Sequence, residues 1–103
     1  MKTFDEYQKA VLRTANSTLS REEMLKNFGM SLAGEVGELL NDLKKHLYHG
    51  KQLDMDNAKS ELGDVLWYVT AMADTLGLKL EDVAEANIEK LKQRYPGGFK
   101  ELK

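Results

Sequence analysis

The sequence predicts an all-α protein built from four helices. Proline occurs once, at Pro96, so no residue of this kind breaks a helix before the end of the chain. Apolar residues recur at spacings of three and four over several long stretches, as they do along one face of a helix. No stretch alternates apolar and polar residues like a half-buried strand. The length fits a single domain, which we assign to residues 1–103.

The first two helices each follow a capping-box pattern. Residues 3–6 carry a threonine and a glutamate at the spacing of a capping box, and the amphipathic pattern that follows predicts a short helix to about Asn16. Residues 20–23 carry a second box, with serine and glutamate, before a much longer apolar stripe. His49 and Gly50 close this stripe, because glycine often takes the left-handed conformation after a helix.

The last two helices are marked by their start and stop signals. Asp54 or Asp56 can cap a third helix, which Gly77 ends. A fourth apolar stripe covers residues 80–94 and stops at the segment 95–99, which contains the proline and two glycines.

Charge and composition exclude several classes of protein. The net charge of −2 argues against a nucleic-acid-binding module, which usually shows a strong basic excess. The absence of cysteine excludes disulfides, thiolate metal sites and a cysteine nucleophile. No apolar signal region or run of membrane-spanning length is present. We therefore expect a soluble cytoplasmic protein with no nucleic-acid or membrane partner.

Two acidic couplets lie in otherwise apolar helical sequence. Glu35 and Glu38 form the first, and Glu61 and Asp64 form the second. Residues three apart share a helix face, so each couplet directs two carboxylates to one side. If the two helices face each other, the four carboxylates make a cage for a hard cation such as Mg²⁺, which binds oxygen ligands together with substrate phosphates. Asp42 continues the first face, but we expect it to be a solvated acid beside two lysines.

The neighbours of the couplets favour a functional interpretation over solvated acids that never meet. No lysine or arginine lies within either couplet, and each couplet encloses a glycine, Gly37 or Gly63, with Gly34 just before the first. A glycine inside a helix costs roughly 1 kcal/mol relative to alanine. Close approach of the two helix backbones around a metal would compensate this cost. Four clustered carboxylates would also raise one another's pKa unless a cation neutralised them.

At these residues the chain resembles the MazG-type nucleoside triphosphate pyrophosphohydrolases of the all-α NTP pyrophosphatase superfamily. The family signature is E-x-x-E, a variable spacer and E-x-x-D, which the two couplets match. The resemblance continues through residues 62–68 and 87–96. It implies a four-helix MazG-like fold that assembles into an oligomeric helical bundle. One departure is Asn57, where larger relatives have a lysine, so a phosphate contact from this position is in doubt.

The resemblance also implies a reaction. Such relatives cleave a nucleoside triphosphate between the α- and β-phosphates, giving the monophosphate and pyrophosphate. Mg²⁺, with Mn²⁺ as a possible substitute, would polarise the α-phosphoryl group and activate a water molecule. The residues implied as both catalytic and metal-binding are Glu35, Glu38, Glu61 and Asp64. Any of them can be the general base.

Four further residues are candidates for substrate binding. Lys90 and Arg94 are spaced to share a face of the last helix and would contact phosphate. Asn87 would read a base edge or a ribose hydroxyl, and Tyr68 would stack on a base. Solvated basic residues near a helix end and a surface asparagine are the plain alternatives.

The apolar stripe of the second helix is wider than one neighbour can bury, which predicts association between chains. We expect a homodimer or a dimer-of-dimers tetramer, in agreement with the resemblance. Two other functions are compatible with the pattern: a non-catalytic helical interaction or regulatory module, and the phosphoribosyl-ATP pyrophosphohydrolase of histidine biosynthesis. The preferred base is not indicated.

Overall fold

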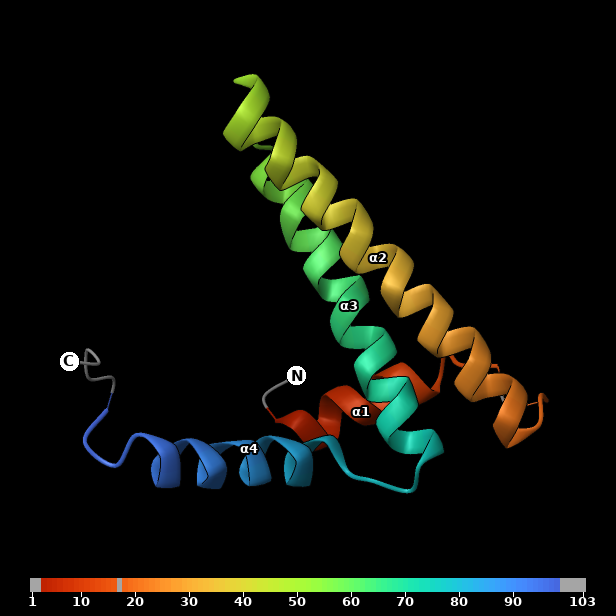
Figure 1. Cartoon of the computed structure of the whole chain (residues 1–103). Coiled ribbons are helices and arrows are strands. Elements are labelled where there is room, and N and C mark those ends of the chain that lie inside the picture. Colours follow the sequence, from red (N-terminus) through yellow and green to blue (C-terminus); the bar gives the residue numbers. More distant parts are fainter. Residues whose placement is uncertain (1–2, 17, 99–103) are drawn as a thin grey trace.

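The computed structural model of the chain describes residues 3–16 and 18–98, which form helices and no strand. α2 and α3 are the longest helices and run antiparallel as a hairpin (Figure 1). α1 crosses this hairpin near its open end, and α4 leads away from it (Figure 1). The all-α prediction is confirmed. The helices are α1 (Phe4–Leu12), α2 (Arg21–His49), α3 (Met55–Thr75) and α4 (Leu80–Arg94).

The first three helices begin as their capping residues predict. In each, the side chain of the capping residue accepts a hydrogen bond from the backbone N–H three residues later. The caps are Thr3, Ser20 and Asp54, with N···O distances of 3.1, 3.2 and 3.1 Å. Asp54 rather than Asp56 therefore caps α3. Each cap satisfies a backbone donor that has no partner inside its own helix.

The ends of the long helices also follow the sequence. Gly50 and Gly77 have φ values of 67° and 77°, in the left-handed region that favours glycine. Lys51 N–H then donates to the Lys45 carbonyl oxygen at 3.2 Å, which satisfies a carbonyl at the end of α2. The turn between α2 and α3 is thus fixed by glycine and backbone hydrogen bonding.

α1 is shorter than predicted: it ends at Leu12 and not at about Asn16. The hydroxyl of Thr14 donates to the Val11 carbonyl oxygen at 2.8 Å and accepts a hydrogen bond from Trp67 Nε1 at 2.9 Å. The tertiary hydrogen bond from α3 therefore holds the chain outside the helix at this point.

A side chain of α1 caps the start of α4. Its N-cap, Lys79, makes no side-chain hydrogen bond. Gln8 on α1 is buried, and its Oε1 accepts from Leu80 N–H at 2.7 Å. Its Nε2 donates to the Leu78 carbonyl oxygen at 3.1 Å and to Asp74 Oδ1 at 3.3 Å. One side chain thus joins α1, the end of α3 and the start of α4.

The core is small and lies where α1 crosses the hairpin. Val11, Phe28 and Ala71 form its buried centre, and partly buried aromatic and methionine side chains surround them. Phe28 and Trp67 meet edge to face, with ring centroids 5.7 Å apart. This cluster fixes α1 against the lower part of the hairpin.

A second apolar surface is left uncovered. On α2 it includes Leu40 and Leu47, which are 58% and 68% exposed, and on α3 it includes Met55 and Leu62, which are 70% and 56% exposed. Leu40 and Leu47 of the widened apolar stripe predicted for α2 are therefore solvent-facing in the single chain, whereas Leu39 and Leu43 are half-buried. In the described part of the chain no helix is long and apolar enough to cross a membrane.

Candidate active site

The two acidic couplets lie opposite each other along the α2–α3 hairpin. Because the helices are antiparallel, Glu35 lies near Asp64, and Glu38 lies near Glu61. The structure thus places the two couplets on facing stretches of α2 and α3, as neighbouring pairs of acids. We call this row, together with Asp42, the acid ladder.

Asp42 extends the ladder toward the α2–α3 turn. Asn57 Nδ2 donates to Asp42 Oδ2 at 3.0 Å and to Glu61 Oε1 at 3.3 Å, so the amide links acids of both helices. Asp42 is half-buried and lies beside Lys45, and this hydrogen bond joins it to the ladder. Its spacing of four from Glu38 was the available sequence signal. Asn57 provides the bridging donor.

Burial and neighbouring carboxylates raise the pKa of two ladder acids, Glu35 and Glu61. Desolvation, followed by the charges of Glu38 and Asp64, raises the pKa of Glu35. Desolvation also raises the pKa of Glu61, and Asp42 raises it further through a hydrogen bond and its charge, while the Asn57 amide acts in the opposite direction. Crowded carboxylates of this kind gain stability when they bind a proton or a cation.

The donor set fits a divalent cation that also binds substrate. Glu61 Oε2 is buried and has no hydrogen-bond partner among the described residues, so a carboxylate oxygen is left for a ligand. Within residues 3–16 and 18–98, no three His, Cys, Asp or Glu side chains converge on one point as a ready chelate. Mg²⁺ does not require such a cage, because it usually takes one or two carboxylates with waters and phosphates. The magnesium site stays a prediction.

The glycines of the couplets have a different role from the one expected. A Cβ atom built at Gly34, Gly37 or Gly63 would meet no atom within 4 Å outside the local helix backbone. All three positions are exposed, so no close approach of helix backbones within the chain requires them. The expected compensation for their cost is therefore wrong for the single chain.

Tyr68 lies close to one end of the ladder. It is half-buried one turn after Asp64, and its ring packs edge-on against Trp67, with centroids 5.0 Å apart. Phe28 is the third member of this aromatic group, 6.4 Å from Tyr68. Trp67 packs against the core, whereas Tyr68 lies between the core and the ladder.

The other three predicted substrate residues lie on α4, away from the ladder. Asn87 and Lys90 line a separate hollow of α4 with Leu78 and Val83, and Arg94 is the exposed last residue of the helix. In the described part of the chain α4 packs on α1 and α3 without contacting α2. A single chain therefore does not bring these residues to the acids.

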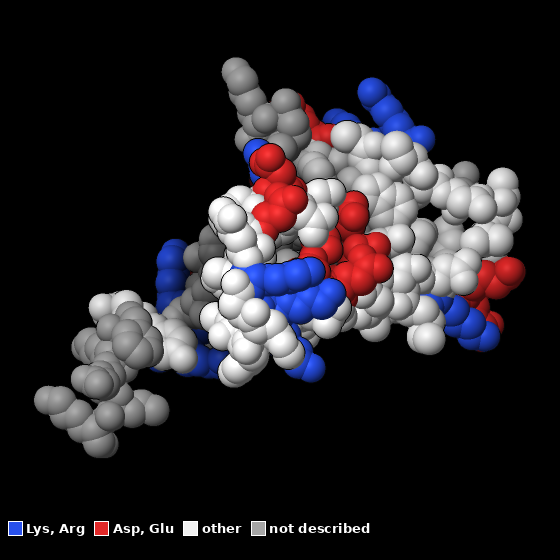
Figure 2. Space-filling view, turned by 90° about the horizontal axis from the view of Figure 1, so that it is seen from above, with Lys and Arg blue, Asp and Glu red and all other residues white. Residues whose placement is uncertain are grey.

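The sequence did not predict two features that lie near the ladder. Tyr7 of α1 is half-buried, and burial together with the charge of Asp64 raises its pKa, which places its hydroxyl near that acid. Only the fold brings α1 there. At the opposite end, Lys45 and Lys51 lie beside Asp42 in a pocket at the α2–α3 turn. Viewed from above, basic and acidic side chains adjoin on this side of the molecule (Figure 2).

Known proteins resemble this chain over the region that contains the acid ladder. The family model described as MazG nucleotide pyrophosphohydrolase domain matches residues 23–99. The chain is also similar to the "Gene 37 protein" of Mycobacterium phage L5, with 39% identity over 80 residues, covering 74% of this chain and 70% of the phage protein. No solved structure matches the chain significantly. The matched family region contains every residue of the acid ladder.

Proposed function

The chain belongs to the MazG nucleotide pyrophosphohydrolase family, and on this premise we propose that it hydrolyses nucleoside triphosphates between the α- and β-phosphates. The products are the nucleoside monophosphate and pyrophosphate. The observation that carries this proposal is the meeting of both couplets across the hairpin, with Glu61 Oε2 buried and unpartnered among them.

The acids would hold Mg²⁺, or Mn²⁺ in its place, through Glu35, Glu38, Glu61 and Asp64. A bound ion of this kind supplies positive charge to the polyphosphate and lowers the pKa of water. The chain itself contributes orientation, because the Asn57 amide fixes the carboxylates of Asp42 and Glu61 relative to each other. A ladder carboxylate accepts the proton of the attacking water as general base.

The proposed substrate contacts divide between one chain and its neighbour. Tyr68 lies at the Asp64 end of the ladder, in position to contact the nucleoside. Asn87, Lys90 and Arg94 lie on a helix that leaves the hairpin, so we assign them to the site of a second copy. The uncovered apolar residues of α2 and α3 support a homodimer or a dimer of dimers.

Steady-state kinetics over the ribo- and deoxynucleoside triphosphates, with pyrophosphate release as the readout, test this function. Phosphoribosyl-ATP belongs in the same panel, because a helical carboxylate site is common to both reactions. We expect EDTA to remove activity and Mg²⁺ or Mn²⁺ to restore it, with poor activity in Ca²⁺, which is larger and binds with looser geometry.

Turnover in excess chelator would contradict the metal-dependent reaction. A protein with neither turnover nor thermal stabilisation by Mg²⁺ would instead be a non-catalytic interaction module.

A further inference from the structure

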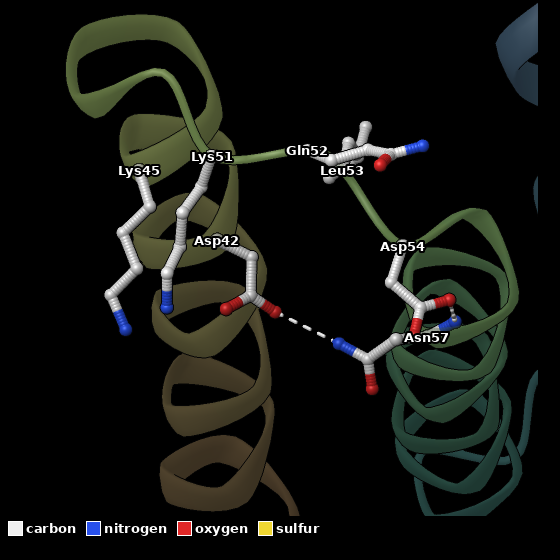
Figure 3. A pocket seen from close by; sticks show the side chains of 7 residues that line it. All are labelled: Asp42, Lys45, Lys51, Gln52, Leu53, Asp54 and Asn57. Carbon is white, nitrogen blue, oxygen red and sulfur yellow. Dashed lines mark hydrogen bonds between the residues drawn. The ribbon is translucent and has the colours of Figure 1, made fainter.

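A pocket of about 130 Å³ opens at the turn between α2 and α3, at the Asp42 end of the acid ladder. Lys45, near the end of α2, and Lys51, in the turn, contribute its basic groups. Figure 3 shows the two lysine side chains running side by side, with Asp42 next to them. Asp42 is hydrogen-bonded to Asn57, which also contacts Glu61, so the pocket adjoins the ladder directly.

Each acid of this pocket accepts a hydrogen bond, whereas its lysines form no ion pair among the described residues. Asp54 accepts the backbone N–H of Asn57, and Asp42 accepts its side-chain amide. The ion pairs found among the described residues join residues 5 and 9, 22 and 26, and 89 and 92, so neither Lys45 nor Lys51 takes part. The ammonium groups of Lys45 and Lys51 are therefore open to a ligand, and as charged donors they suit an anion.

The backbone keeps the two lysines together. Gly50 turns the chain with a left-handed φ of 67°, and Lys51 N–H donates to the Lys45 carbonyl oxygen. His46 Nδ1 donates to the Lys51 carbonyl oxygen at 2.8 Å. These contacts fix the backbone of the turn from which both lysines extend. An anion bound at this turn can therefore be reached by both ammonium groups.

We propose that Lys45 and Lys51 bind the β- and γ-phosphates of the substrate and so fix its direction along the ladder, an inference that rests on the proposed function. The triphosphate tail lies toward the α2–α3 turn, and the scissile bond lies beside the acids. The nucleoside lies toward the Glu35–Asp64 end, where Tyr7 and Tyr68 provide aromatic surface. The two ends of the ladder therefore differ: basic side chains lie at one end and aromatic side chains at the other.

Inhibition by each of the two reaction products tests a different end of the site. Pyrophosphate carries the phosphates assigned to the lysines, whereas the nucleoside monophosphate does not. In Lys45→Gln/Lys51→Gln we expect KM for the triphosphate and the inhibition constant of magnesium pyrophosphate to rise by roughly tenfold or more, because hydrogen bonds to charged groups are lost. We expect little change in kcat or in inhibition by the monophosphate.

Two variants serve as controls. Lys59→Gln removes one lysine charge on α3 at an exposed position outside this pocket, and it should leave all these constants unchanged. Lys45→Arg/Lys51→Arg keeps both charges and should retain most of the pyrophosphate affinity. Calorimetric titration of magnesium pyrophosphate into the wild type and the double glutamine variant measures the same site without turnover.

Unchanged KM and pyrophosphate inhibition in the double glutamine variant would overturn the inference while leaving the proposed reaction intact. Selective loss of monophosphate inhibition would overturn it by reversing the direction of the substrate. If the wild type shows no turnover, the proposed function fails separately, and calorimetry still decides whether the lysines bind pyrophosphate.

Discussion

At the scale of single residues, Glu61 has the most constrained position of the acids. One of its carboxylate oxygens accepts a hydrogen bond from Asn57, and the other is buried with no hydrogen-bond partner in the described part of the chain. Its neighbours Asp42 and Glu38 are both acidic, so its pKa is raised after the larger effect of desolvation. A glutamine at this position would keep the acceptor for Asn57 and remove the charge.

We therefore expect Glu61→Gln, and likewise Glu38→Gln, to lose nearly all turnover while retaining the helical fold. Each change removes the charge of a proposed metal ligand with hardly any change in volume. Triphosphate hydrolysis and far-ultraviolet circular dichroism measure the two properties. Glu22→Gln, at the exposed start of α2, is the matched control and should remain active. Near-wild-type activity of either ladder variant at saturating Mg²⁺ would refute the assignment.

The same substitution has a pH-dependent effect on stability. Because the folded pKa of Glu61 lies above the ordinary value of 4.5, its ionisation destabilises the metal-free fold, and this cost disappears as the pH falls through the folded pKa toward 4.5. Metal-free Glu61→Gln should be more stable than the wild type at pH 7, with a difference that shrinks on acidification. Urea unfolding in chelator at several pH values measures this difference. A difference independent of pH would contradict the electrostatic account.

At the scale of the helices, the features predicted correctly are those encoded locally. Caps at Thr3, Ser20 and Asp54 and stops at Gly50 and Gly77 depend on residues within a turn of each other. The facing of the couplets was predictable as well, because it follows from residue spacing and an antiparallel hairpin.

The features that were missed depend on contacts distant in the sequence. Trp67 donates to Thr14 across 53 residues and shortens α1, and Gln8 caps α4 from 72 residues away. Neither side chain carries a local signal for its partner. The hydrogen bond between Asp42 and Asn57 was missed for a similar reason, since Asn57 lies on the other helix of the hairpin.

Gln8 should be important for stability because it satisfies buried backbone groups at the junction of three helices. Gln8→Ala would leave the N–H of Leu80 and the carbonyl of Leu78 without this partner. We expect a loss of about 1–3 kcal/mol in the free energy of unfolding, measured by urea denaturation. Gln93→Ala, at an exposed position of α4, is the control and should change the stability little.

Substitution of Gly63 tests whether another chain packs against α3. A Cβ atom at this exposed helical position meets nothing within 4 Å in the single chain, so Gly63→Ala should stabilise the protein by up to about 1 kcal/mol through helix propensity. Urea denaturation measures this gain. Destabilisation would show that another backbone, such as that of a second copy, packs closely against Gly63.

At the scale of the whole molecule, the hairpin has two unlike surfaces. The acid ladder follows one side of α2 and α3, and exposed apolar side chains such as Leu40 and Leu62 point from other positions of the same helices. α4 adds further apolar side chains, including Ile88 and Leu91, each 45% exposed, and its later turns run clear of the hairpin (Figure 1). A chain with so much uncovered apolar surface is expected to associate.

We therefore predict a homo-oligomer of at least two chains whose sites are shared between copies. The ladder acids and Arg94 are far apart in the fold of one chain, yet both are expected to serve the same substrate. If Arg94 reaches the ladder of a neighbour, Glu38→Gln chains and Arg94→Ala chains, each inactive alone, should regain part of the activity when mixed, because some sites then receive both intact residues. Light scattering establishes the size of the assembly, and mixing each variant with itself is the control. A fully active monomer at assay concentration would refute the shared site, and so would an oligomer whose mixed chains exchange subunits without regaining activity.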